Sequence, residues 1–121
     1  MKQESAYLRH ILDSIARIEM YTRGGRGSFD GDPMIQDAVV RNLEIIGEAV
    51  KHLSAKERAR QPAIPWTSIA GFRDILIHEY FGIRLATVWD VVEHRLPPLK
   101  AAVNALLEVQ VEPPGVPPPG H

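Results

Sequence analysis

The sequence predicts an all-α protein, an up-and-down bundle of four to five helices with short connections. Apolar residues recur at i, i+3, i+4 and i+7 along most of the chain, which is the spacing of one face of an α-helix. No stretch alternates apolar and polar residues between turn signals, so no sheet is expected. A length of 121 residues is enough for one domain with its own hydrophobic core.

The first half of the chain predicts two long helices. The apolar stripe of residues 5–21 indicates a helix whose first residue, a serine, is its N-cap. The polar run 22–28 contains three glycines and predicts a flexible connection. The second helix begins with Asp32 as N-cap and Pro33 at the first helical position, and continues to Leu53. Its wide apolar arc favours a central position, or one shared between the core and a subunit interface.

Two neighbouring residues in the second helix stand out. Gly47 lies inside the helix, where glycine costs about 1 kcal/mol relative to alanine, and it therefore indicates the close approach of another helix. Glu48 is either a buried, hydrogen-bonded carboxylate or an exposed one, and the sequence leaves both possibilities open.

Shorter helices are expected next. Residues 54–61 predict one helical turn and a loop. Trp66 and Ile69 are expected as core anchors of a third helix that also buries the apolar run 75–77 and ends at Gly82.

The last part of the chain predicts further helix and then a tail. An apolar stripe over residues 83–92 leads to Pro97 and Pro98, which we expect to break or kink the helix before it resumes. We expect a helical domain over residues 1–109 and a disordered, proline-rich tail over 110–121.

The composition limits the function classes. The net charge of −1 argues against nucleic-acid binding through bulk charge. The absence of cysteine excludes disulfides and thiolate metal sites. No apolar run approaches the roughly 20 residues of a membrane span, and the N-terminus shows no signal-peptide pattern. We therefore expect a cytoplasmic protein with no membrane contact.

The segment 72–81 concentrates the chemically active groups in the pattern Arg-x4-His-x-Tyr. Arg73 and His78 lie about 140° apart around an ideal helix, so they cannot form one tight face. Either the helix ends near His78, or both side chains face a cleft whose other wall comes from elsewhere. Tyr80 is expected at or beyond the helix end and accessible.

An arginine and a histidine without a metal-ligand set suit phosphate chemistry. Arg73 would neutralise a phosphoryl group and His78 would move a proton, the functions that RNA cleavage needs when no metal takes part. Asp74 is a candidate for orienting either group. No histidines have metal-binding spacing, so neither a metal nor another cofactor is expected. The same residues also fit a surface arginine and a satisfied histidine without catalytic function.

The segment 73–81 resembles the Arg-x4-His-x-Tyr signature of HepT-like toxins of the HEPN superfamily. The similarity covers roughly residues 5–109 and leaves only the proline-rich tail outside. Further matching segments are residues 41–49 in the second helix, Trp66 with Ile69 and Gly71 before the motif, and Val88-Trp89 and Leu96-Pro97-Pro98-Leu99 in the last helices.

The resemblance implies a homodimeric, metal-independent RNase toxin whose site combines residues of both subunits. It implies Arg73 as ligand of the phosphate and the transition state, His78 as general acid and base, and a 2′,3′-cyclic phosphate product from tRNA or mRNA. It also implies an MntA-like nucleotidyltransferase antitoxin that adds AMP to Tyr80. The bulk and negative charge of AMP would exclude RNA phosphate from the site.

One departure from the family pattern bears on activity. Many HEPN nucleases carry asparagine after the motif arginine, whereas Asp74 adds a negative charge that would lower phosphate affinity. The alternative function is a non-catalytic HEPN-like dimer that serves as an interaction or substrate-binding subunit of a nucleotidyltransferase. A basic cleft formed by Arg41, Arg73 and Arg84 would offset the acidic net charge and favour the RNase.

Overall fold

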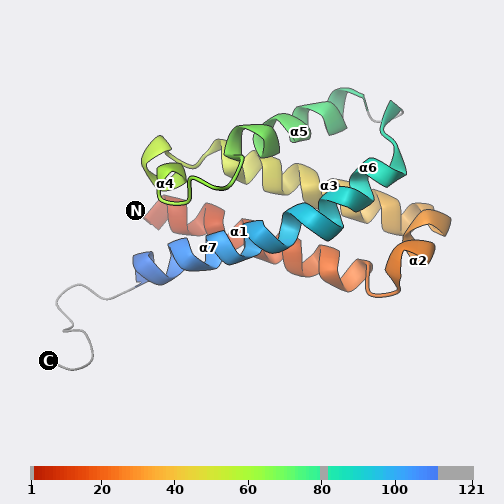
Figure 1. Ribbon diagram of the computed structural model, residues 1–121, viewed down its shortest axis with the longest axis horizontal. Coiled ribbons are helices and arrows are strands. Elements are labelled where there is room, and N and C mark those ends of the chain that lie inside the picture. Colours follow the sequence, from red (N-terminus) through yellow and green to blue (C-terminus); the bar gives the residue numbers. More distant parts are fainter. Residues whose placement is uncertain (1, 80–81, 112–121) are drawn as a thin grey trace, which may run out of the picture.

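The computed structural model describes residues 2–79 and 82–111, which form an elongated bundle of helices with no strand among them (Figure 1). The elements are α1 (Lys2–Tyr21), α2 (Gly25–Gly31), α3 (Pro33–Lys51), α4 (Ala55–Ala59), α5 (Trp66–His78), α6 (Leu85–Asp90), the π-helical turn η2 (Val91–Arg95) and α7 (Leu96–Val111).

The long helices alternate in direction along the bundle. Figure 1 shows α1, α3, α5 and the continuous helix α6–η2–α7 running back and forth, with α2 at one end of the bundle and α4 at the other. Helix α3 packs against both α1 and α5, and α7 packs against α1. These contacts confirm the predicted all-α, up-and-down bundle. None of the described helices is both long and apolar enough to cross a bilayer.

The apolar stripe of the first helix is its buried face, as predicted. Leu8, Ile11, Ile15 and Ile18 are at most 1% exposed. The helix begins at Lys2, so Ser5 lies inside it, and the prediction that Ser5 is the N-cap is wrong. The residues that precede Ser5 are good helix formers, which lets the helix start earlier.

The glycine-rich run does not form the flexible connection that its composition predicts. Only residues 22–24 connect α1 to the short helix α2. Phe29 is fully buried in α2 and its ring lies 5.4 Å from that of Trp89, measured between centroids. Burial of this aromatic ring stabilises a segment that glycine alone would leave disordered. Gly25 makes the turn into α2 with a φ of 86°, which glycine adopts without strain.

The start of α3 is the predicted one. The Oδ1 atom of Asp32 accepts a hydrogen bond of 2.9 Å from the amide of Met34, and Pro33 occupies the first turn. The helix ends at Lys51, two residues before the predicted end.

We expect Asp32→Ala to lower the free energy of unfolding by about 1 kcal/mol, because the helix loses its N-cap acceptor. Urea denaturation measures the change. Asp30→Ala is the matched control, since the Asp30 side chain forms an exposed ion pair of 3.5 Å with Arg26 and caps no described helix, and the substitution should change stability by less than about 0.5 kcal/mol. Equal losses in the two variants would contradict a capping role.

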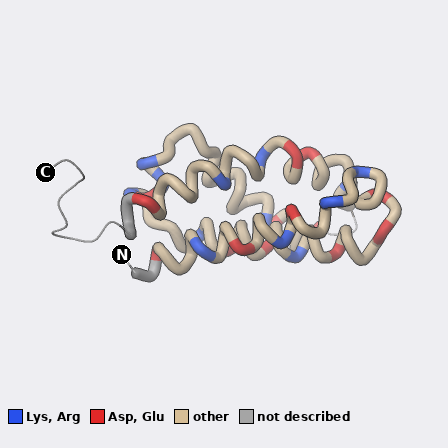
Figure 2. The backbone as a smooth tube through the Cα atoms, turned by 90° about the horizontal axis from the view of Figure 1, so that it is seen from below, with Lys and Arg blue, Asp and Glu red and all other residues tan. Residues whose placement is uncertain are grey.

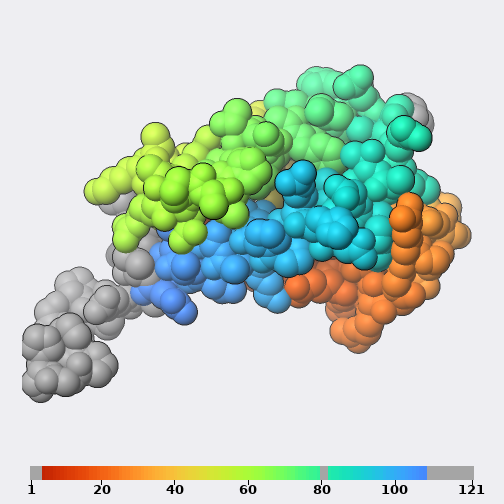
Figure 3. Space-filling model, viewed as in Figure 1, coloured from red at the N-terminus to blue at the C-terminus, as the bar shows by residue number. Residues whose placement is uncertain are grey.

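Helix α3 is the centre of the bundle. From the side seen in Figure 3, α1 and α3 are largely hidden behind α4 to α7. At Gly47 the close approach of α5 is confirmed, because a Cβ atom there would overlap the Cβ of Arg73 and lie 3.3 Å from the carbonyl oxygen of Ile69. Glycine is therefore required for the observed packing of α5 on α3.

The connection from α3 to α5 contains the predicted helical turn, α4. Ser54 is its N-cap, and the carboxylate of Glu4 in α1 accepts hydrogen bonds from the amide and hydroxyl of Ser54 at 2.7 and 3.0 Å. Trp66 is buried as predicted, and its indole N–H donates to two backbone carbonyl oxygens at 3.0 Å. Ile69 packs against the core and is partly buried.

Helix α5 ends at His78, four residues before the predicted stop at Gly82. Leu76 is buried, but Ile75 and Ile77 are 44% and 42% exposed. The prediction that all three residues belong to the core is therefore wrong for the two isoleucines. Successive residues of a helix point about 100° apart, so three consecutive side chains cannot share one buried face.

Pro97 and Pro98 change the helix type without breaking the helix. Neither proline has an N–H group, and a proline ring conflicts with the carbonyl group four residues earlier. The π-helical turn widens the helix at this point, and the amide of Leu96 donates to the carbonyl oxygen of Val91, five residues back. Helix α7 then continues to Val111. Residues 112–121 lie outside the described residues, so the domain boundary and the disordered tail stay predictions.

Candidate functional site

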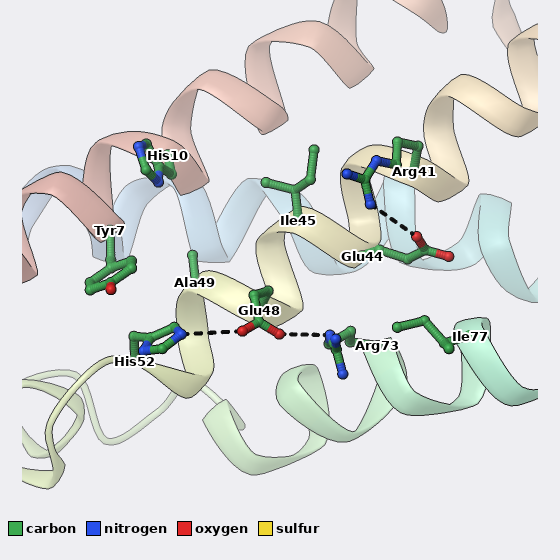
Figure 4. A pocket seen from close by; sticks show the side chains of 10 residues that line it. All are labelled: Tyr7, His10, Arg41, Glu44, Ile45, Glu48, Ala49, His52, Arg73 and Ile77. Atoms are coloured by element: carbon green, nitrogen blue, oxygen red, sulfur yellow. Dashed lines mark hydrogen bonds and ion pairs between the residues drawn. The ribbon is translucent and has the colours of Figure 1, made fainter.

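A pocket of about 220 Å³ lies between α1, α3 and α5, next to the predicted motif (Figure 4). Apolar side chains from α3 and α5 form part of its wall, and most of the remaining wall is polar or charged. The polar lining residues are Tyr7 and His10 from α1, Arg41, Glu44 and Glu48 from α3, His52 at the C-cap of α3, and Arg73 from α5.

The guanidinium group of Arg73 is held by two carboxylates. Its Nε atom lies 2.9 Å from Oε1 of Glu48, and its Nη1 atom lies 3.0 Å from Oδ1 of Asp74. The side chain is 27% exposed. Its Nη2 atom forms no hydrogen bond with any residue that the structure describes.

Glu48 is neither fully buried nor free. Its side chain is 47% exposed, and its second oxygen, Oε2, lies 3.1 Å from Nε2 of His52. The imidazole ring of His52 in turn stacks on the ring of Tyr7, with centroids 4.6 Å apart and planes 7° from parallel. Both oxygens of Glu48 are therefore engaged, which resolves the two possibilities that the sequence left open.

Asp74 contacts the arginine. Its Oδ1 atom accepts hydrogen bonds from Nζ of Lys51 at 3.1 Å and from Nη1 of Arg73 at 3.0 Å. These hydrogen bonds hold the pKa of Asp74 below its usual value, and the one from Lys51 has the larger effect. The geometry thus connects Asp74 to Arg73, one of the two groups it was expected to orient.

The lowered pKa of Asp74 predicts a pH-dependent stability. A carboxyl whose pKa is lower in the folded state stabilises the fold above its unfolded-state pKa, and this contribution disappears as the pH falls through the folded-state pKa. We therefore expect Asp74→Asn to lower the melting temperature slightly at pH 7, with the difference from wild type shrinking as the pH falls below about 4 and disappearing only below the folded-state pKa of Asp74.

Thermal melts from pH 7 to pH 2.5 test this expectation. Asp13→Asn, which replaces an exposed carboxylate on α1, is the control and should leave the pH dependence unchanged. Parallel stability curves for wild type and Asp74→Asn over the whole range would contradict the contribution of Asp74.

His78 lies apart from the pocket. It is the last residue of α5, is exposed, and forms no hydrogen bond or ion pair with any residue described. It does not line the pocket that contains Arg73. One chain therefore does not bring the two motif residues together in one pocket, and α5 does end at the histidine. Tyr80 lies outside the described residues.

The pocket is not a basic cleft of Arg41, Arg73 and Arg84, which would have offset the acidic net charge. Arg41 pairs with Glu44 at 3.5 Å, and Arg73 pairs with two carboxylates. Arg84 is not among the lining residues. Figure 2 shows basic and acidic residues interspersed along the described helices. In residues 2–79 and 82–111 no group of three or more His, Asp or Glu side chains is arranged to hold a metal ion.

Four lining residues were not identified from the sequence: Tyr7, His10, Glu44 and His52. A signal for part of this set does exist, because the polar lining residues of α3 and of its C-cap recur at intervals of three, four and four. That spacing places them on one face of a helix. The contribution of α1 had no comparable signal, since Tyr7 meets His52 only through the packing of α1 on α3.

The described residues form an all-helical protein with a surface pocket. An arginine in this pocket is bound by two carboxylates, and an exposed histidine ends the same helix. A family model described as "Ribonuclease HepT-like" matches residues 11–106. The chain therefore belongs to the HepT-like ribonuclease family, which confirms the resemblance found in the motif.

Curated proteins of two archaea and a bacterium are similar over most of this chain. A "Probable ribonuclease HepT" of Thermococcus cleftensis is 41% identical over 101 residues, which are 83% of this chain and 92% of that protein. A "Putative RNase" of Caldanaerobacter subterraneus subsp. tengcongensis is 40% identical over 109 residues, 89% of this chain and 97% of that protein.

A third relative is longer. A "Gamma-glutamylcyclotransferase and putative RNase" of Methanocaldococcus jannaschii is 44% identical over 108 residues, 88% of this chain. The match covers 49% of that protein, so the chain spans about half of its length. No solved structure matches the chain.

Proposed function

We propose that the protein is an endoribonuclease toxin that cleaves RNA without a metal ion, at a site completed by a second copy of the chain. The placement of Arg73 and His78 carries the proposal. The Nη2 atom of the arginine has no hydrogen-bond partner among the described residues, and the histidine is exposed at the end of the same helix. Membership of the HepT-like ribonuclease family supports RNA as the substrate.

The arrangement of the two residues supports a homodimer. Arg73 and His78 diverge by about 140° around the helix axis, so one chain does not direct both at the same phosphate. A two-fold axis near the end of α5 would place the histidine of each copy near the arginine of the other. The exposed side chains of Ile75 and Ile77 provide apolar surface beside the motif for such an interface.

In the proposed reaction the 2′-hydroxyl group of the RNA attacks the adjacent phosphorus and the bond to the 5′-oxygen breaks. A neutral His78 accepts the proton of the hydroxyl group, and the imidazolium group so formed donates that proton to the leaving 5′-oxygen. Arg73 stabilises the charge that develops on the phosphoryl oxygens. The products are a 2′,3′-cyclic phosphate and a 5′-hydroxyl end.

Cleavage of RNA by the purified protein tests this function. We expect degradation of tRNA or mRNA in the presence of EDTA, fragments that end in a cyclic phosphate, and growth arrest when the chain is expressed alone. Intact RNA together with normal growth would refute the proposal. Dependence of cleavage on added magnesium would refute the metal-independent mechanism alone.

The proposal includes control by a partner in the cytoplasm. A nucleotidyltransferase antitoxin would add AMP to Tyr80 and block the RNA site by occupancy and charge repulsion. Co-expression with that partner should increase the intact mass by one or more AMP groups, and Tyr80→Phe should abolish the increase. An unchanged mass after co-expression would rule out the modification.

The charge balance of the pocket favours one alternative. Both carboxylates that contact Arg73 offset its positive charge, and the net charge of the chain is −1. These observations suit a non-catalytic dimer that serves as the interaction or substrate-binding subunit of a nucleotidyltransferase. A purified chain that binds this partner tightly but leaves RNA intact would support the alternative.

A further inference from the structure

We infer that Glu48 is a positioning residue for RNA cleavage, that it acts through Arg73, and that His52, stacked on Tyr7, holds Glu48 in place. The inference rests on the proposed function and concerns the same site. It assigns a role to three residues outside the Arg-x4-His-x-Tyr motif.

The contact of Glu48 with Arg73 joins two helices. An arginine side chain has several rotatable bonds, and its guanidinium group must be fixed in orientation to bind phosphate productively. Asp74 contacts the same group but lies next to Arg73 in α5, so it moves with the arginine backbone. Glu48 belongs to α3, and its 2.9 Å contact with Nε fixes the guanidinium group relative to the centre of the bundle.

Glu48 itself needs support because its side chain is 47% exposed. That support comes from the 3.1 Å contact between its Oε2 atom and Nε2 of His52. The ring of His52 lies flat on the ring of Tyr7, which packs against the hydrophobic core. Figure 4 shows His52, Glu48 and Arg73 in one line, with Tyr7 beside His52. The contacts therefore lead from α1 through α3 to the arginine of α5.

A second effect of Glu48 has the opposite sign. Its negative charge lies beside the place where a phosphate would meet Arg73, so by repulsion alone it would weaken RNA binding. Positioning and repulsion make opposite predictions for Glu48→Gln, which removes the charge and keeps the shape. Removing a repulsive group would raise RNA affinity and activity, whereas removing a positioning group lowers kcat.

We expect Glu48→Gln to lower kcat about tenfold and to change KM by less than about threefold. The double variant with Arg73→Lys tests whether Glu48 acts through the arginine. If it does, Glu48→Gln lowers kcat much less in the Arg73→Lys background, because effects that share one partner are not additive. An increase in kcat/KM, or equal losses in both backgrounds, would overturn the inference.

Paired variants test the support of Glu48. His52→Leu should lower kcat about threefold, while His52→Gln, which keeps a donor near the position of Nε2, should restore most of the loss. Tyr7→Leu should lower kcat and Tyr7→Phe, which keeps the stacked ring, should not. His94→Leu is the control, because His94 is an exposed imidazole that contacts Glu93 at 3.2 Å and does not line the pocket. Equal activities of His52→Leu and His94→Leu would overturn the role of His52.

The experiment distinguishes a failure of the proposed RNase activity from a failure of the positioning role of Glu48. Absence of cleavage by the wild-type dimer refutes the proposed RNase and the positioning role with it. Normal cleavage by the wild type together with wild-type kinetics of Glu48→Gln refutes the positioning role and leaves the RNase standing. Thermal melts of each variant establish that the compared proteins are folded.

Discussion

His78→Ala should lower the rate of RNA cleavage by about 100- to 10,000-fold, which is the contribution of a positioned general acid or base. The same substitution should change the free energy of unfolding by less than about 0.5 kcal/mol, because the side chain is exposed and has no partner among the described residues. Single-turnover cleavage of a labelled RNA measures the first quantity, and urea denaturation measures the second.

His94→Ala provides the control for this experiment. His94 is also exposed, and its contacts are with neighbouring acidic residues in or next to η2. We expect cleavage at the wild-type rate in this variant. Full activity of His78→Ala would show that the motif histidine has no role in proton transfer.

Mixed dimers extend the test to the composite site. If each site combines the arginine of one chain with the histidine of the other, a dimer of one His78→Ala chain and one Arg73→Ala chain retains one intact site. If each chain forms its own site, this dimer retains none. Tagged copies purified together would give this species. Activity equal to that of the pure variants would contradict a shared site.

Gly47→Ala should destabilise the protein by about 1–3 kcal/mol, the usual cost of adding an atom to a closely packed contact. The new methyl group would overlap the Cβ of Arg73, so α5 must move away from α3. Thermal denaturation should show a melting temperature several degrees lower. Cleavage should fall as well, because the contact between Glu48 and Arg73 depends on the same spacing between the helices.

Gly71→Ala is the matched control, since Gly71 lies in α5 and a Cβ atom there would meet nothing within 4 Å. Alanine is the better helix former, so we expect stability to rise by up to about 1 kcal/mol. A stabilising effect of both substitutions would contradict the close helix contact at Gly47.

Local sequence signals predicted the parts of the fold that depend on local interactions. The stripe of α1 and the Asp32–Pro33 start of α3 both appear as expected, because helical periodicity and capping act within a few residues. The glycine-rich run was predicted as a flexible loop because its local composition disfavours helix. Burial of Phe29 against the distant Trp89 outweighs that local preference.

The site also combines residues that local sequence patterns indicate with residues that only the packing of the helices brings together. Arg73 and His78 could be selected from the sequence, because an arginine and a histidine so spaced suggest phosphate chemistry. Glu48 was noticed without a role, and Tyr7 and His52 were not selected at all. The roles proposed for them depend on contacts between residues of different helices, which no local pattern contains.

The sequence by itself determined the helical class, the location of most helices along the chain, and the different directions in which Arg73 and His78 leave α5. These properties follow from helix geometry, which repeats along a chain whatever it packs against. The tertiary structure alone decided that Ile75 and Ile77 are exposed, that the prolines produce a π-helical turn, and that Glu48 meets Arg73. These features depend on how the helices pack, because packing determines which face of each helix is covered and which side chains come within contact distance.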